Sequence, residues 1–67
     1  MKNIVERYEL NDTVIEIEVS SHGFDVICHW HNKTEHFLND VSLATAYAFV
    51  AGFMYDRVKL MESEATR

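Results

Sequence analysis

Three closely spaced histidines, His29, His31 and His36, are the residues of this 67-residue chain best suited to chemistry. Neutral imidazole is a good ligand for zinc, copper and nickel. His29 and His31 are one residue apart, so on a β-strand both side chains point to the same face. A tight turn at Asn32–Lys33 would place His36 opposite His29 on the neighbouring strand. The sequence therefore predicts one candidate metal site, formed by these three histidines.

Two other interpretations of the histidine cluster remain open. It can be an incidental feature of a solvated sheet face, in which case the protein needs no cofactor. It can also act as a pH sensor, because clustered imidazoles repel one another when they become protonated near pH 6. In the metal interpretation, Glu16 or Asp25 on nearby strands would provide carboxylate support.

The same residues offer little for catalysis. Cys28 and His29 are adjacent on a strand and therefore point to opposite faces, which argues against a thiolate–imidazole pair. Cys28 is expected to be an inert thiol in the core. Glu16 and Glu18 are expected on an open sheet surface, where no cleft shifts the pKa of a carboxyl group. The sequence predicts that the protein is not an enzyme.

Composition places the chain among small, folded, acidic proteins. Hydrophobic residues make up 48% and charged residues 25% of a length that suits one domain, residues 1–67. The single cysteine and the charged N-terminal segment predict a cytoplasmic protein without a signal peptide. The apolar run Leu43–Tyr55 is shorter than the roughly 20 residues of a membrane span. A net charge of −5 argues against direct binding to nucleic acid.

Alternation of apolar and polar residues predicts four strands, at about 4–10, 13–19, 24–31 and 34–38. Short turn signals separate them, and the loop Ser20–Gly23 includes a glycine able to take positive φ. The turns imply an antiparallel meander in which apolar residues pair on one face. The expected pairs are Tyr8–Ile15, Ile15–Cys28, Ile17–Val26, Val19–Phe24 and Cys28–Phe37.

The sheet is followed by one long helix, predicted at about 40–61, with a frayed tail at 62–67. Asn39 is the expected N-cap, and Leu38 and Leu43 occupy the positions of a hydrophobic staple. The predicted fold class is thus α+β, a four-stranded antiparallel meander with one C-terminal helix packed on one sheet face (ββββα).

The apolar surface of this helix is wider than one small sheet normally covers, which is an arc of about 100°. One stripe, expected to face the sheet, contains Leu43, Tyr47, Val50 and Met54. A second stripe and a row of small residues are expected to face a partner, and the roles of the two stripes can be reversed. Alternatively, the small residues fit over Trp30 and Phe37 within one monomer. The predicted dimer or partner interface comprises Ala46, Phe49, Phe53, Leu60, Ala44, Ala48 and Gly52.

These features favour a non-enzymatic protein-interaction module that forms a homodimer. It would act as an inhibitor or adaptor by docking on another macromolecule, an unidentified protein. An acidic surface would serve a basic target, and one version of this hypothesis is a DNA mimic. The expected acidic surface comprises Glu6, Glu9, Glu16, Glu18 and Asp25. The alternative is a metal-binding or pH-responsive module that uses the three histidines.

Overall fold

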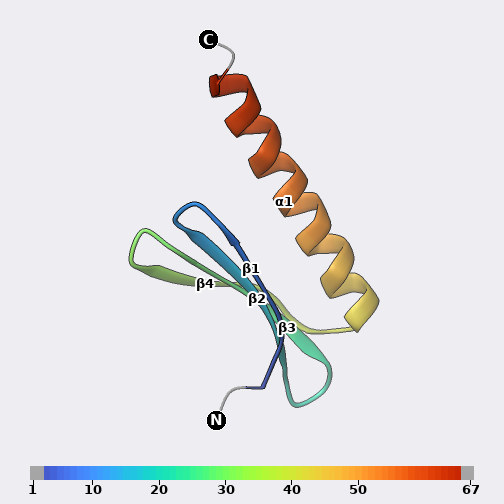
Figure 1. Cartoon of the computed structure of the whole chain (residues 1–67). Coiled ribbons are helices and arrows are strands. Elements are labelled where there is room, and N and C mark those ends of the chain that lie inside the picture. Colours follow the sequence, from blue (N-terminus) through green and yellow to red (C-terminus); the bar gives the residue numbers. More distant parts are fainter. Residues whose placement is uncertain (1–2, 66–67) are drawn as a thin grey trace.

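The computed structural model describes the backbone of residues 3–65 and the side chains of residues 3–59. Four strands form one antiparallel sheet in the order β1-β2-β3-β4, and one helix follows, as the sequence predicts. Figure 1 shows the helix lying on one side of the sheet and continuing beyond it. The elements are β1 Ile4–Leu10, β2 Thr13–Val19, β3 Phe24–Trp30, β4 Lys33–Val41 and α1 Leu43–Ala65.

The third turn differs from the prediction. His31 and Asn32 have positive φ angles of 49° and 64°, so they form the turn between β3 and β4. Asparagine tolerates this left-handed conformation well. β3 therefore ends at Trp30, one residue early, and β4 begins at Lys33. β4 also continues to Val41, three residues beyond its predicted end at residue 38.

The predicted register is confirmed for four of the five pairs: Tyr8–Ile15, Ile15–Cys28, Ile17–Val26 and Val19–Phe24. The pair Cys28–Phe37 was wrong, because the shifted turn places Glu35 opposite Cys28. Farther along β4 the register shifts twice, and Phe37 is the extra residue between His36 and Leu38. This bulge lets Phe37 and Leu38, neighbours in sequence, both pack against the hydrophobic core.

The helix begins later than predicted. Asn39 and Asp40 belong to β4, so Asn39 is not the N-cap. Ser42 takes that role: its hydroxyl accepts the Thr45 N–H at 3.1 Å, and its carbonyl accepts the Ala46 N–H at 3.0 Å. The predicted hydrophobic staple between Leu38 and Leu43 is also wrong, because it required Asn39 as the N-cap. At the other end, the backbone remains helical to Ala65, past the expected end near residue 61.

Hydrogen bonds connect the junction between β4 and α1 to the β2–β3 turn. The Asp40 carboxylate accepts hydrogen bonds from the Ser20 hydroxyl and the His22 N–H, and the Asp40 N–H donates to Asp25 at 2.9 Å. The Ser20 bond, followed by the His22 bond, lowers the pKa of Asp40. Gly23 lies against the Val41 carbonyl, where it is needed for close approach rather than for the positive φ that the sequence suggested. These contacts set where α1 starts.

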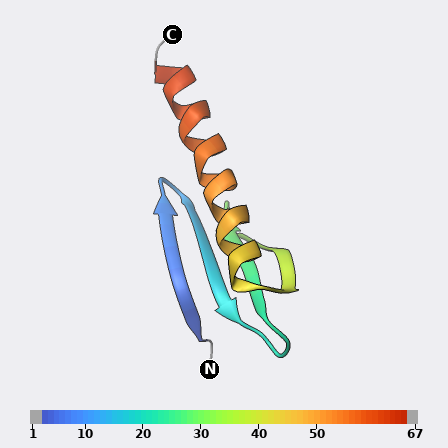
Figure 2. The same cartoon turned by 90° about the vertical axis from the view of Figure 1, so that its right-hand side faces the viewer.

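The core lies between α1 and the sheet. Its buried residues come from β2, β3 and α1: Ile15, Ile17, Val26, Ala46 and Val50. The helix packs on β2, β3 and β4. Figure 2 shows β1 at the side of the sheet away from α1. Because α1 is about 34 Å long and a seven-residue strand spans about 24 Å, the helix extends past the sheet.

Candidate functional site

The sheet-facing side of α1 combines the two predicted stripes. Ala46 is 0% exposed and Val50 is 3% exposed, so both belong to the core. The sequence predicts Ala46 in a partner interface, and this prediction is wrong, because the residue packs against the chain's own sheet. Tyr47, assigned to the sheet, is 36% exposed. The buried side of α1 therefore lies between the two predicted stripes. The periodicity of the sequence alone does not determine this rotation of the helix about its axis.

Phe49 and Phe53, also assigned to the partner, pack within the chain and are only partly buried. Both rings contact Phe37, with centroids 5.6 Å and 5.5 Å away. Phe53 also meets Trp30 at 6.2 Å, and Arg57 lies over the Trp30 ring at 5.7 Å. The bulge in β4 brings Phe37 to this position. The side chain of Leu60, the last member of the predicted stripe, lies outside the described residues.

The row of small residues is exposed, as a partner surface requires. Ala44, Ala48 and Gly52 lie on the outer face of α1, and a Cβ at Gly52 would meet nothing within 4 Å. Beside them Tyr55 is 62% exposed, with the Lys59 ammonium 5.7 Å from its ring centroid. A groove of about 330 Å³ lies along this face, lined by Ala48, Phe49, Gly52, Phe53 and Asp56.

The three histidines do not converge. His29 lies opposite Thr34, and His36 lies opposite Ile27. His31 is in the turn, where its Nδ1 is 3.5 Å from a carboxylate oxygen of Asp12. Among the residues that the structure describes, no group of three or more potential ligands is arranged to hold a metal ion. The predicted metal site depended on pairing His29 with His36, and the shifted turn removes that pairing.

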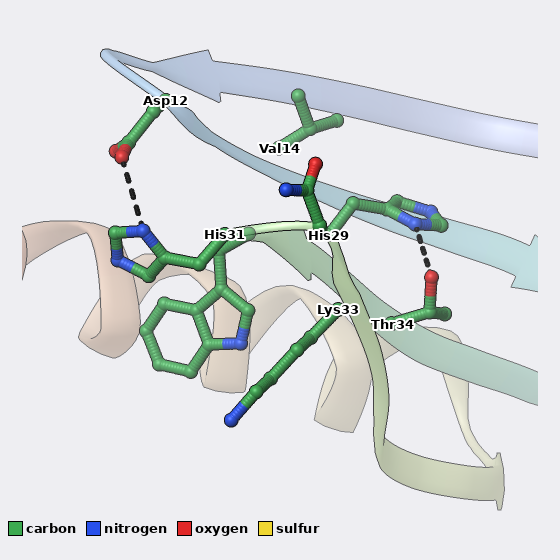
Figure 3. Close-up of a pocket in the computed structure, with 8 residues that line it drawn as sticks. Asp12, Val14, His29, His31, Lys33 and Thr34 are labelled. Atoms are coloured by element: carbon green, nitrogen blue, oxygen red, sulfur yellow. Dashed lines mark hydrogen bonds and ion pairs between the residues drawn. The ribbon is translucent and has the colours of Figure 1, made fainter.

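A hollow of about 550 Å³ lies between the β1–β2 and β3–β4 turns (Figure 3). His29 and His31 both line it, but their rings point in different directions. His31 points toward Asp12 at one side, while His29 points toward Thr34 at the other. The hollow is therefore lined by two of the three predicted histidines, but their rings do not point at one position where a ligand could bind both.

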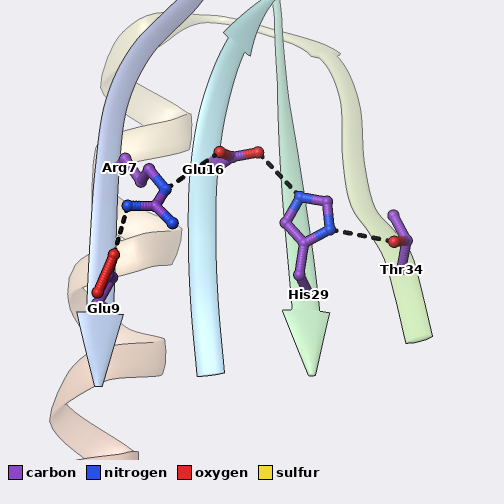
Figure 4. Close-up of polar contacts among 5 residues, drawn as sticks. All are labelled: Arg7, Glu9, Glu16, His29 and Thr34. Atoms are coloured by element: carbon purple, nitrogen blue, oxygen red, sulfur yellow. Dashed lines mark hydrogen bonds and ion pairs between the residues drawn. The ribbon is translucent and has the colours of Figure 1, made fainter. Parts of the chain in front are cut away.

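A row of polar contacts crosses the sheet face away from α1 (Figure 4). The Glu16 carboxylate lies 3.5 Å from Arg7 Nε and 2.9 Å from His29 Nε2. On the far side of the imidazole, His29 Nδ1 is 3.0 Å from the Thr34 hydroxyl. Arg7 also pairs with Glu9. The sequence places Glu16 and His29 on one face, and the pairing of β2 with β3 could have revealed their contact.

The predicted acidic surface is divided between the two faces of the sheet. Glu6 lies on the helix side, where it accepts a hydrogen bond from the Tyr47 hydroxyl at 3.3 Å. Glu16 and Glu18 are only 7% and 8% exposed on the other face. Asp25 accepts the Asp40 N–H, and Glu9 pairs with Arg7. Most of these carboxylates therefore have structural partners within the chain.

Cys28 lies in the core, as expected, with 0% exposure. Burial, and then the nearby Glu35 carboxylate, raise the pKa of the Cys28 thiol. Both effects disfavour the thiolate, which is the nucleophilic form.

We expect Glu16→Ala to destabilise the fold by about 1–3 kcal/mol, because a nearly buried carboxylate is shared by Arg7 and His29. The estimate is modest because Arg7 is 51% exposed and water screens its charge. Urea unfolding followed by Trp30 fluorescence measures the change. Glu35→Ala, which removes an exposed carboxylate hydrogen-bonded to Trp30, is the matched control and should cost less. Equal losses would contradict a structural role for the polar row.

Comparison of this chain with protein-family models, with curated proteins and with solved structures finds no match. Within the described residues, no helix is both long enough and apolar enough to span a membrane.

Proposed function

We propose that this chain is a non-enzymatic protein-interaction module that works as a homodimer through the outer face of α1. The observation that carries the proposal is that this face is exposed but uncharged from Ala44 to Tyr55. A helix that meets only water on its outer side normally carries charged or strongly polar residues there. Thr45 is the most polar side chain on this part of the face, and its hydroxyl accepts a hydrogen bond from the Ser42 hydroxyl.

The face has the bulky and small parts that two copies need to fit together. Tyr55 projects into solvent, whereas Ala48 and Gly52 leave open space beside the groove. Two antiparallel copies of α1, related by a two-fold axis near Ala51 and Gly52, place Tyr55 of each copy over Ala48 of the other. Large side chains opposite small ones give close helix packing, and a two-fold dimer uses the same patch twice.

Charge and surface area also support a second copy as the occupant. The chain carries a net charge of −5, yet this face contributes no like charges to oppose pairing over Ala44–Tyr55. The protein exposes 4753 Å² of surface, whereas a compact 7.8 kDa monomer exposes about 4,400 Å². Association along the projecting helix would cover surface that the single chain leaves open.

Such a dimer would act by occupying the surface of another protein, as an adaptor or an inhibitor. The described residues provide no arrangement that favours chemistry: the thiol is buried, the nearly buried carboxylate is paired, and the histidines are dispersed. The exposed acids give a general preference for basic partners. A DNA mimic would need an ordered acidic row, and the partners of Glu9, Glu16 and Asp25 weigh against one.

We expect the wild-type protein to sediment at twice its 7.8 kDa chain mass at micromolar concentration. Ala48→Glu should shift it toward the monomer, weakening association at least tenfold, or about 1.4 kcal/mol. The reason is that two carboxylates would be placed in the apolar contact between helices.

Asn39→Glu is the control for the sedimentation experiment, because it adds the same charge at an exposed position on β4. It should leave the dimer intact. A wild-type protein that is monomeric at these concentrations, or equal weakening by both substitutions, would contradict the proposal.

A further inference from the structure

The sheet face beneath α1 has room for more than one helix. Four strands spaced about 4.8 Å apart form a surface roughly 19 Å wide, whereas one helix with its side chains covers about 10–12 Å. α1 packs on β2, β3 and β4 and leaves β1 at the open side, as Figure 2 shows. The face of β1 on the α1 side of the sheet is therefore only partly covered by the helix.

Exposed apolar side chains lie next to this partly covered face of β1. Val19 is 50% exposed at the end of β2, and Val58 is 40% exposed on α1. Tyr8 lies on the helix side of β1, because it pairs with the buried Ile15, and it is only half-buried. We name this surface the β1 strip; it comprises Glu6, Tyr8, Val19, Tyr47 and Val58.

One acidic group lies in the middle of the β1 strip. Glu6 pairs with the buried Ile17, so its side chain is on the helix side, and its carboxylate accepts the Tyr47 hydroxyl. Partial desolvation raises the pKa of Tyr47, and the neighbouring Glu6 carboxylate raises it further. The carboxylate therefore lies beside an aromatic hydroxyl on the helix side of β1, where it can form a charge-assisted hydrogen bond with an incoming cation.

Within residues 3–59, no cation of the chain's own serves this carboxylate. Arg7 points to the opposite face, where it contacts Glu9 and Glu16. Arg57 lies over Trp30 and reaches Thr13, and Lys59 lies over Tyr55. A second copy of the β1 strip would therefore bring a carboxylate and no described cation. This charge pattern favours a basic partner over self-association on this surface.

We propose that the β1 strip docks a basic amphipathic helix from a partner protein, which lies beside α1 and directs a lysine or arginine to Glu6. The strip is as long as β1, about 24 Å, which a helix of about 16 residues spans. The apolar row of the incoming helix covers Tyr8, Val19 and Val58, and its cation pairs with the carboxylate. This inference rests on the proposed function in that it names the partner class of the interaction module.

A 16-residue amphipathic peptide made of leucine and lysine serves as the probe, and the same design with glutamate in place of lysine is its control. We expect saturable binding of the lysine peptide in calorimetry, with no binding of the glutamate peptide. Amide shifts of the isotope-labelled protein should change along β1 and near Tyr47 and Val58. Shift changes confined to Ala44–Tyr55 on the outer helix face, or no saturable binding, would overturn the inference.

Substitutions at Glu6 test the charge requirement. Glu6→Gln should weaken binding of the lysine peptide about tenfold, because it removes a charge-assisted hydrogen bond. Glu9→Gln removes the same charge from the other face of β1 and should change affinity less than twofold. Glu6→Lys should transfer the preference to the glutamate peptide. Equal losses from Glu6→Gln and Glu9→Gln would show attraction to net charge alone and overturn the docking site.

The two proposals fail separately. Sedimentation of the wild-type protein and Ala48→Glu reports on the outer face of α1, and the peptide titrations report on the β1 strip. The Ala48→Glu variant should bind the lysine peptide as the wild type does, because Ala48 lies on the exposed side of α1 away from the sheet. Loss of peptide binding in that variant would place the peptide on the outer helix face and overturn the β1 strip.

Discussion

Ala46→Glu is expected to unfold the protein. Ala46 is 0% exposed where α1 meets the sheet, packed in one cluster with Ile15, Ile17, Val26 and Val50. A glutamate there buries an unpaired charge and adds volume to a filled core, at a cost of more than about 3 kcal/mol. That cost is comparable with the total stability of a domain this small. Circular dichroism and urea titration measure the loss of structure.

Ala48→Glu is the control for this core substitution. It makes the same chemical change two residues later on α1, at an exposed position on the opposite side of the helix. It should leave the helical signal and the unfolding midpoint of the monomer nearly unchanged, so the comparison is made at dilutions where the wild type is dissociated. Similar unfolding of both variants would contradict the orientation of α1 described above.

The contrast between these two alanines separates what the sequence predicts about the helix from what it does not. The length of the apolar segment predicted a long helix, and its excess apolar width predicted a second contact surface. The rotation of α1 about its axis depends on which side chains the sheet can accommodate. Ala46 lies over the middle of the sheet because the rings of Phe49 and Phe53 are directed to Phe37, which a bulge in β4 brings inward. Periodicity contains no information on that bulge.

The histidines illustrate the same limit on the sheet. Alternation placed His29 correctly on β3 and on the face away from α1, together with Glu16. The predicted metal site also needed the next turn to lie at Asn32–Lys33. A chain that can form its turn at either of two adjacent positions gives two registers, and backbone preferences at His31 and Asn32 select between them. In the first two hairpins every predicted pair is confirmed, although β1 shifts register between Ile4 and Glu6.

Gly23→Ala is expected to destabilise the fold by about 1–3 kcal/mol, the usual range for overpacking. A Cβ on Gly23 would lie 2.6 Å from the Val41 carbonyl oxygen and 3.1 Å from the Asp40 carbonyl carbon. Both neighbours are backbone atoms, so they cannot rotate away as a flexible side chain would. Val41 precedes the N-cap Ser42, and a shift there would move the start of α1 relative to the sheet.

Gly52→Ala is the matched substitution, because Gly52 is the other of the two glycines in the chain. A Cβ there meets nothing within 4 Å, and alanine favours the helix over glycine by about 0.5–1 kcal/mol. In the monomer the two substitutions should therefore change the urea midpoint in opposite directions. Gly52→Ala should at the same time weaken the dimer, because it adds a methyl group where two copies of α1 approach. A gain in monomer stability together with a loss of association assigns Gly52 to an interface; a gain in both would exclude close helix approach there.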